Sequence, residues 1–119
     1  MNFDDAVATH SKWKHQLRDR LAKHDGSLNP HEISADHKCE LGEWIYGEAA
    51  TYSSFPEYIK LKYEHARFHT VAMELVKKAN SGELIDEEIA PCSNSEFSMS
   101  SSAVVMAIVA MKKRLMDRQ

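Results

Sequence analysis

Hydrophobic residues recur every three or four positions along most of this chain, which is the spacing of one face of an α-helix. One such stripe begins at Leu61 and ends at Ala79, just before Asn80-Ser81-Gly82, a typical end for a helix. Another stripe runs from Phe97 to Leu115 with the same spacing. The alternating pattern of a half-buried strand is nearly absent. These stripes predict an all-α protein.

Capping residues indicate where the predicted helices begin. Asn2, followed by acidic residues, favours the start of the first helix, and Ser54-Phe-Pro-Glu57 has the form of a capping box with proline in the first turn. The expected helices cover residues 4–24, about 35–46, 54–80 and 83–89, and a last one starts between Ser93 and Ser98 and runs toward Met116. These lengths and short connections favour an antiparallel four-helix bundle with an additional short helix, in one domain of residues 1–119.

Composition and charge narrow the function classes. The net charge of −3 gives no general attraction to nucleic acid or to an anionic membrane. No apolar run approaches the roughly 20 residues of a membrane span, and residues 1–20 lack the layout of a signal peptide. Two cysteines, Cys39 and Cys92, are too few for the disulfide framework of a secreted protein. We therefore expect a cytoplasmic protein with no membrane contact and no nucleic-acid partner.

Seven histidines give the chain its most distinctive chemistry. His65 and His69 lie one helical turn apart, a spacing suited to binding one metal ion. His10 interrupts the apolar stripe of the first helix. A lone histidine on an apolar face is more often a hydrogen-bonded core residue than a ligand. Three such rings in one bundle each need a polar partner, and one cation would satisfy all three.

Cys39 is the fourth candidate ligand, and the short helix near residues 35–46 carries it. A thiolate with three imidazoles makes the closed tetrahedral site that zinc favours. The simpler alternative is that Cys39 is a small buried hydrophobic residue.

These residues resemble the bacterial chemoreceptor zinc-binding domain family, often called CZB. The resemblance rests on His10-Ser-Lys-Trp13, Cys39-x-Leu-Gly-x-Trp-x-Tyr-Gly47 and His65-x-x-x-His69, and it continues into Phe97-Ser98 and Ser101. It implies a zinc site formed by His10, Cys39, His65 and His69. It also implies a dimerising helical domain that is attached to cytoplasmic chemoreceptors or diguanylate cyclases. In that family, zinc occupancy or oxidation of the zinc-bound cysteine changes the output.

We therefore expect a zinc-binding sensory domain rather than an enzyme, with Zn²⁺ as its cofactor and Cys39 as its redox switch. A homodimer is expected, with a chemoreceptor or diguanylate cyclase domain as partner in cis or in trans. The 119 residues include no such output domain, which leaves open whether the chain is free-standing or part of a longer receptor.

The surroundings of the predicted site follow from neighbouring residues. Each ligating imidazole should donate its other N–H to a carboxylate or a backbone carbonyl. Asp36 and Glu40 flank Cys39 and are the nearest carboxylate candidates. Trp13 and Trp44 are expected to shield the site from water.

Four other classes of protein share some of these features. A metalloprotease helix has a glutamate directly after its first histidine, where this chain has Ala66. A di-iron bundle would place glutamates three residues before the histidines, where this chain has Lys62 and Ala66. A helical interaction module without metal remains an alternative, as does a thiol-based redox sensor that pairs Cys39 with Cys92.

Overall fold

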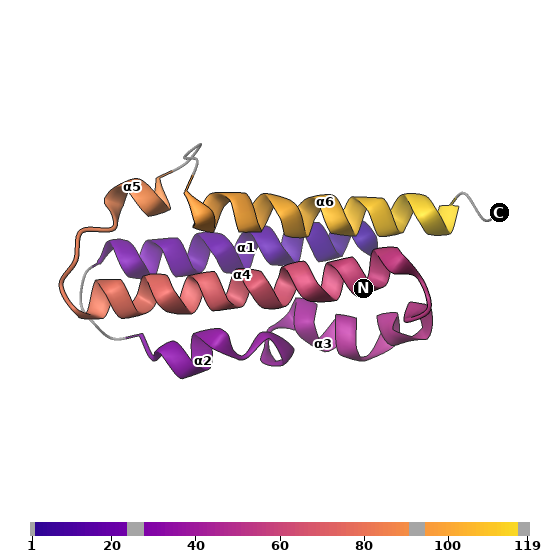
Figure 1. The fold of residues 1–119 in the computed structure, drawn as a ribbon, viewed down its shortest axis with the longest axis horizontal. Helices are drawn as coiled ribbons and strands as arrows, with labels where there is room; N and C mark the ends of the chain where they lie inside the picture. The colour runs from indigo at the N-terminus through magenta and orange to yellow at the C-terminus, as the bar shows by residue number, and fades with distance from the viewer. Residues whose placement is uncertain (1, 24–27, 91–94, 117–119) are drawn as a thin grey trace.

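The computed structural model describes residues 2–23, 28–90 and 95–116 (Figure 1). Three long helices dominate this part of the chain: α1 (Phe3–Ala22), α4 (Pro56–Asn80) and α6 (Glu96–Met116). Five short elements complete it: α2 (Pro30–Ser34), η1 (Asp36–Lys38), α3 (Glu40–Tyr46), η2 (Glu48–Tyr52) and α5 (Asp86–Ile89). No strand occurs among the described residues, so the prediction of an all-α protein is confirmed.

Each long helix has two main neighbours. α4 packs against α6 on one side and against α2 on the other, and α1 packs against α6 and α3. α1 and α4 run in the same direction in Figure 1, whereas α6 runs in the opposite direction. The segment from α2 to α3 therefore lies between α1 and α4 on the side away from α6.

The predicted stripes form the hydrophobic core. Leu61, Phe68 and Leu75 of α4 are buried, and their stripe faces a matching stripe on α6. The Phe68 ring stacks on Phe97 of α6 with ring centroids 5.6 Å apart, and it meets Trp13 of α1 edge-on at 5.5 Å. Phe68 thus joins all three long helices beside the predicted histidine site.

The observed starts of the helices agree only in part with the capping residues predicted from the sequence. At α1 the Asn2 side chain accepts a hydrogen bond from Asp5 N at 2.7 Å, and the capping box is complete. The predicted capping box at Ser54 is wrong, because α4 begins at Pro56 with Phe55 as N-cap and without a side-chain cap. Proline favours the first helical position, so it shifts the cap to the residue directly before it. The predicted end of α4 at Asn80 is confirmed.

The segment between α1 and α4 differs most from expectation. Helix α2 lies outside the predicted helices: Asn29 caps it by accepting from His31 N at 2.9 Å, and Pro30 takes the first helical position. The helix expected near residues 35–46 is instead η1 followed by α3, with a break at Cys39. Cys39 therefore lies at the N-cap of α3 in extended backbone, not inside a helix as predicted.

Candidate metal centre

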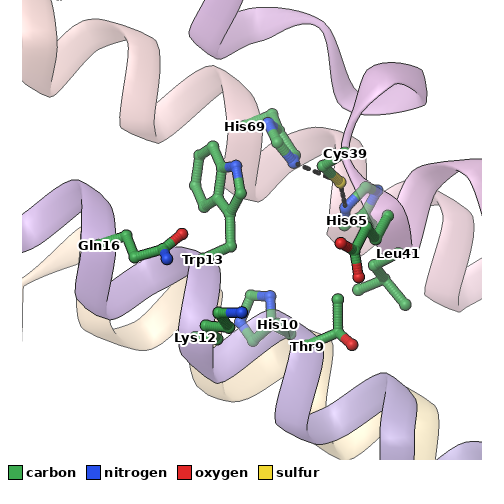
Figure 2. Close-up of a pocket in the computed structure, with 10 residues that line it drawn as sticks. Thr9, His10, Lys12, Trp13, Gln16, Cys39, Leu41, His65 and His69 are labelled. Carbon is green, nitrogen blue, oxygen red and sulfur yellow. Dashed lines mark hydrogen bonds between the residues drawn. The ribbon is translucent and has the colours of Figure 1, made fainter.

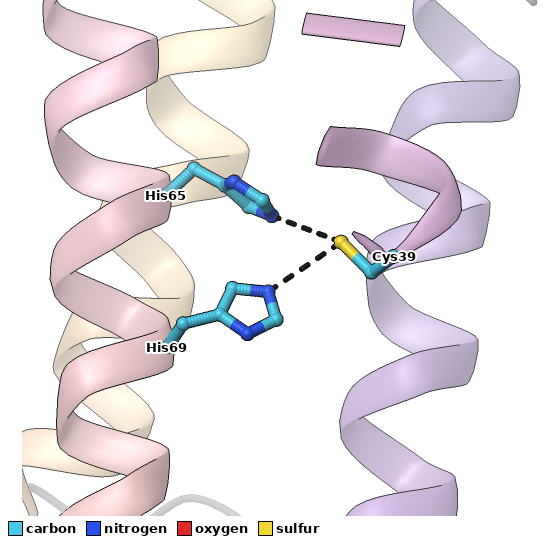
Figure 3. A group of neighbouring side chains, drawn as sticks. All are labelled: Cys39, His65 and His69. Carbon is cyan, nitrogen blue, oxygen red and sulfur yellow. Dashed lines mark hydrogen bonds between the residues drawn. The ribbon is translucent and has the colours of Figure 1, made fainter. Parts of the chain in front are cut away.

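Cys39 is held at its position by the first turn of α3. Its Sγ accepts a hydrogen bond from Gly42 N at 3.2 Å, as the side chain of an N-cap residue does. The thiol also points to the backbone oxygen of Asp36, at 3.4 Å. These contacts turn the sulfur toward α4 (Figure 3).

Gly42 allows η1 to fold back on α3. A Cβ atom at position 42 would collide with the backbone oxygen of Asp36, so no other residue fits without moving that backbone. The close approach keeps Asp36 and Cys39 together on the side that faces α4. The glycine in the Cys-x-Leu-Gly motif therefore has a packing role at the site.

His65 and His69 present their Nε2 atoms to the sulfur of Cys39 (Figure 3). The two distances from Sγ are 3.3 Å to His65 and 3.5 Å to His69, and the three ligand atoms all lie within 4.8 Å of one another. In a tetrahedral zinc site, Zn–S and Zn–N bonds place sulfur and nitrogen ligands about 3.5 Å apart. The spacing of these three atoms therefore fits one zinc ion.

The second nitrogen of His69 has the partner that a metal ligand needs. His69 Nδ1 donates to the backbone oxygen of Ile33 in α2 at 2.7 Å. A carbonyl can only accept, so the ring proton lies on Nδ1 and Nε2 carries a bare lone pair facing Cys39. α2 thus sets the orientation of this ring.

The second nitrogen of His65 is buried and has no hydrogen-bond partner. The nearest carboxylate oxygen is Asp36 Oδ2, at 4.0 Å, and the same oxygen accepts a hydrogen bond from the Tyr46 hydroxyl at 2.7 Å. Of the two carboxylates singled out in the sequence, Asp36 therefore lies beside a candidate ligand. Glu40 is exposed at the edge of the neighbouring cavity.

His10 is the one predicted ligand that does not join the facing atoms. Its ring lines the same cavity as Cys39, His65 and His69 (Figure 2). Its Nε2, however, lies 2.9 Å from Ser101 Oγ on α6. The structure thus brings three predicted ligands together and places the fourth on the wall of their cavity.

Burial keeps the three imidazoles neutral. Loss of hydration lowers the pKa of His10 from 6.5 to about 4 and that of His65 to about 3, and it also lowers the pKa of His69. Each ring therefore has one bare nitrogen at neutral pH, the form that binds a metal. Burial raises the pKa of the Cys39 thiol, so metal binding there would displace a proton.

A cavity of about 280 Å³ lies over the cluster, between α1 and α3 (Figure 2). Polar side chains of Thr9, Lys12 and Gln16 line it on the α1 side. The Trp13 ring lies 4.6 Å from the His69 ring and lines the cavity beside the cluster. Trp44 is buried against Phe3 instead and does not line this cavity.

Some contacts of the site had no signal in the sequence. Ile33 contributes only a backbone carbonyl, which any residue supplies. Ser101 is among the residues of the family resemblance, but nothing in the sequence pairs it with His10. Cys92, the suggested thiol partner of Cys39, lies outside the described residues.

An all-helical chain with a facing Cys-His-His cluster has the features of a helical metal-binding domain. The chain matches the family model described as "chemoreceptor zinc-binding domain" (CZB) over residues 10–76, more than half of its length. It therefore belongs to the CZB family, as the resemblance indicated. The search of curated proteins and the search of solved structures gave no significant match. None of the described helices has the length and apolar character needed to cross a bilayer.

Proposed function

We propose that this protein is a zinc-binding sensory domain whose ion is held by His10, Cys39, His65 and His69. The observation that carries the proposal is the approach of Cys39 Sγ to two imidazole Nε2 atoms at 3.3 and 3.5 Å. One sulfur and several imidazoles make a donor set that suits zinc. Membership of the CZB family supports the same metal.

His10 is proposed as the fourth ligand on two observations. Its neutral ring lines the cavity over the other three ligands, and the family match begins at this residue. Four protein ligands close a tetrahedral zinc site and leave no position for a reactive water. A regulatory role rather than a catalytic one follows from that closed set.

The finer architecture is part of the proposal. We infer an antiparallel four-helix bundle in which the segment from α2 to α3 is the fourth member, and a domain that spans residues 1–119. The packing of α1 on α6 and α3, and of α4 on α6 and α2, supports it. The ligands come from α1, α4 and the N-cap of α3, so a bound ion would tie these three elements together.

Cys39 is proposed as the redox switch. It is a free, half-buried thiol on the wall of a cavity that polar side chains of α1 also line, so a small oxidant can reach it. Attack of the sulfur on hypochlorous acid forms an S–Cl bond and releases hydroxide, and hydrolysis then releases chloride and leaves the sulfenic acid. Sulfenic sulfur is a poor ligand, so three imidazoles would remain.

The output is proposed as bacterial chemotaxis or cyclic-di-GMP signalling, through a chemoreceptor or diguanylate cyclase domain in cis or in trans. The family's description as a chemoreceptor domain supports it. A cytoplasmic location fits a reduced thiol ligand. A homodimer is supported by exposed apolar side chains that share one face of α6: Met99, Met106, Val109 and Met116.

Metal analysis of protein purified without added zinc tests the proposal. We expect one zinc per chain in the wild type and in Cys92→Ala, and a large loss in Cys39→Ser. Wild-type protein that folds and contains no zinc would favour the metal-free interaction module instead. Full zinc and unchanged thermal stability in Cys39→Ser would contradict the proposed ligand set.

A further inference from the structure

A buried hydrogen bond joins α1 to α6 at the edge of the site. His10 Nε2 and Ser101 Oγ are 2.9 Å apart, 91 positions apart in the sequence. Only 3% of His10 and 4% of Ser101 is exposed, so water does not compete strongly for either group. This bond is not needed to explain how the other three candidate ligands come together.

Ser101 lies where the α6 stripe is otherwise apolar. Phe97, Val104 and Ile108 flank it on the same face, and all three are buried. A hydroxyl buried in such a face costs stability unless it forms a hydrogen bond. The adjacent Ser100 meets this need within its own helix by donating to the Phe97 backbone oxygen at 3.1 Å. Ser101 instead forms its hydrogen bond with His10 on α1.

The bond also bears on which nitrogen of His10 can act as a ligand. A neutral imidazole has one N–H and one bare nitrogen, and only the bare nitrogen binds a metal. If Nε2 carries the proton and donates to Ser101 Oγ, the bare nitrogen is Nδ1. His69 has the same arrangement with the nitrogens exchanged, because its Nδ1 donates to Ile33 and its Nε2 is bare.

We propose that Ser101 is a positioning residue of the metal site: it accepts the Nε2 proton of His10, leaves Nδ1 as the ligand atom and couples α6 to the ion. The inference rests on the proposed zinc-binding function and extends it to a helix outside the matched residues 10–76. Through His10, a bound zinc ion would then be linked to α6, the last described helix.

The first test compares zinc affinities by competition with a chromophoric chelator. Removal of an outer partner of a metal ligand typically costs 10- to 100-fold in affinity, so we expect about a 10-fold loss or more in Ser101→Ala. Ser101→Thr keeps the hydroxyl and should recover most of that loss. Ser100→Ala is the matched control, because it removes a buried hydroxyl one position away that donates within α6, to the Phe97 backbone oxygen.

The second test asks whether Ser101 acts through His10. In a His10→Ala background, Ser101→Ala should cause no further loss of zinc affinity. Nitrogen-15 NMR of the zinc-loaded wild type should show His10 bound through Nδ1 and protonated at Nε2, and this readout needs no variant to fold.

The outcomes separate the two proposals. If wild-type protein binds no zinc, the proposed function fails, and this inference fails with it. If zinc binds but Ser101→Ala equals Ser100→Ala, or if His10 coordinates through Nε2, only the role of Ser101 is overturned.

Discussion

His69 donates its Nδ1 proton to the backbone oxygen of Ile33, and this single contact turns its other nitrogen toward Cys39. The helix that carries Ile33, α2, has only five residues and packs on α4. A short element between the long helices thus sets the tautomer of a candidate zinc ligand. The integrity of the α2–α3 segment should therefore govern metal affinity, and several measurements can check this.

Replacement of Gly42 should weaken both the fold and the site. In Gly42→Ala the new Cβ would collide with the backbone oxygen of Asp36, and relief of the collision should cost roughly 1–3 kcal/mol in the free energy of unfolding. Urea unfolding and a zinc competition assay measure the two effects. Glu40→Ala, an exposed change in the same turn, is the control. If Gly42→Ala and Glu40→Ala have the same unfolding free energy and the same zinc affinity, the position of η1 does not depend on this close approach.

Asp36 should contribute to zinc affinity through His65. Asp36→Asn keeps the size of the side chain but removes the charge 4.0 Å from His65 Nδ1, so we expect roughly a 10-fold weaker affinity. Tyr46→Phe removes only the hydroxyl that bonds the same carboxylate and should have a smaller effect. Chelator competition measures both. A loss in Glu40→Gln as large as that in Asp36→Asn would argue for a general charge effect instead.

Stability of the metal-free protein should fall with acidification. Burial lowers the pKa of His10 to about 4 and that of His65 to about 3, so below pH 6.5 the unfolded chain binds more protons than the folded chain. The stability is therefore complete above pH 6.5 and declines as the pH falls toward the folded-state values. Between pH 6.5 and 5, each ring should lower the free energy of unfolding by about 2 kcal/mol.

Urea unfolding of the metal-free protein at a series of pH values checks this expectation. The dependence should weaken in His10→Gln, whereas His15→Gln should retain it because His15 is exposed. A wild-type unfolding free energy that does not change between pH 6.5 and 5 would mean that the rings are hydrated in the folded state.

Hypochlorous acid should release zinc through Cys39 alone. Chelator absorbance after treatment should rise equally in the wild type and in Cys92→Ala, while mass spectrometry locates the oxidation. Helix content should change little, since α1 and α4 keep their packing on α6. The proposed role of Cys39 as the switch is contradicted if zinc stays bound while Cys39 is oxidised, or if zinc release requires Cys92.

The exposed face of α6 should carry the homodimer. Met106 and Val109 are 70% and 54% exposed, so Met106→Glu with Val109→Lys should convert the protein to a monomer in light scattering at micromolar concentration. Leu84→Glu changes an 87% exposed apolar residue outside α6 and should leave the dimer intact. A wild-type protein that is already monomeric at this concentration would contradict the proposed homodimer.

Local periodicity predicted the long helices and the burial of two candidate ligands. His65 and His69 lie four positions apart on a helix whose apolar stripe is clear, so their shared face depends on α4 alone. The sequence indicates Cys39 as a candidate ligand but places it inside a helix rather than at an N-cap, because the break before α3 depends on contact between Gly42 and the backbone of Asp36. That contact arises from folding of the segment on itself and has no periodic signal.

The other differences between the predicted and the observed structure have two causes. Some sequence patterns fit two local structures, and some contacts join residues far apart in the chain. Asn29-Pro30 fits a turn as well as an N-cap followed by proline, and the packing of α2 on α4 decides in favour of the helix. The contact of His10 with Ser101 depends on how α1 packs against α6. No pattern near His10 carries that information.

The three facing ligand atoms and the groups that orient them all lie between Ile33 and His69. α1 and α6 contribute the hydrogen-bonded pair of His10 and Ser101, and α1 also places Trp13 beside His69. Most of the metal-binding apparatus is therefore one contiguous stretch of sequence, which makes it a candidate for grafting onto other helical proteins. It also separates the proposed fourth ligand, His10, from the other three candidates, so a substitution at position 10 would leave their arrangement within this stretch in place.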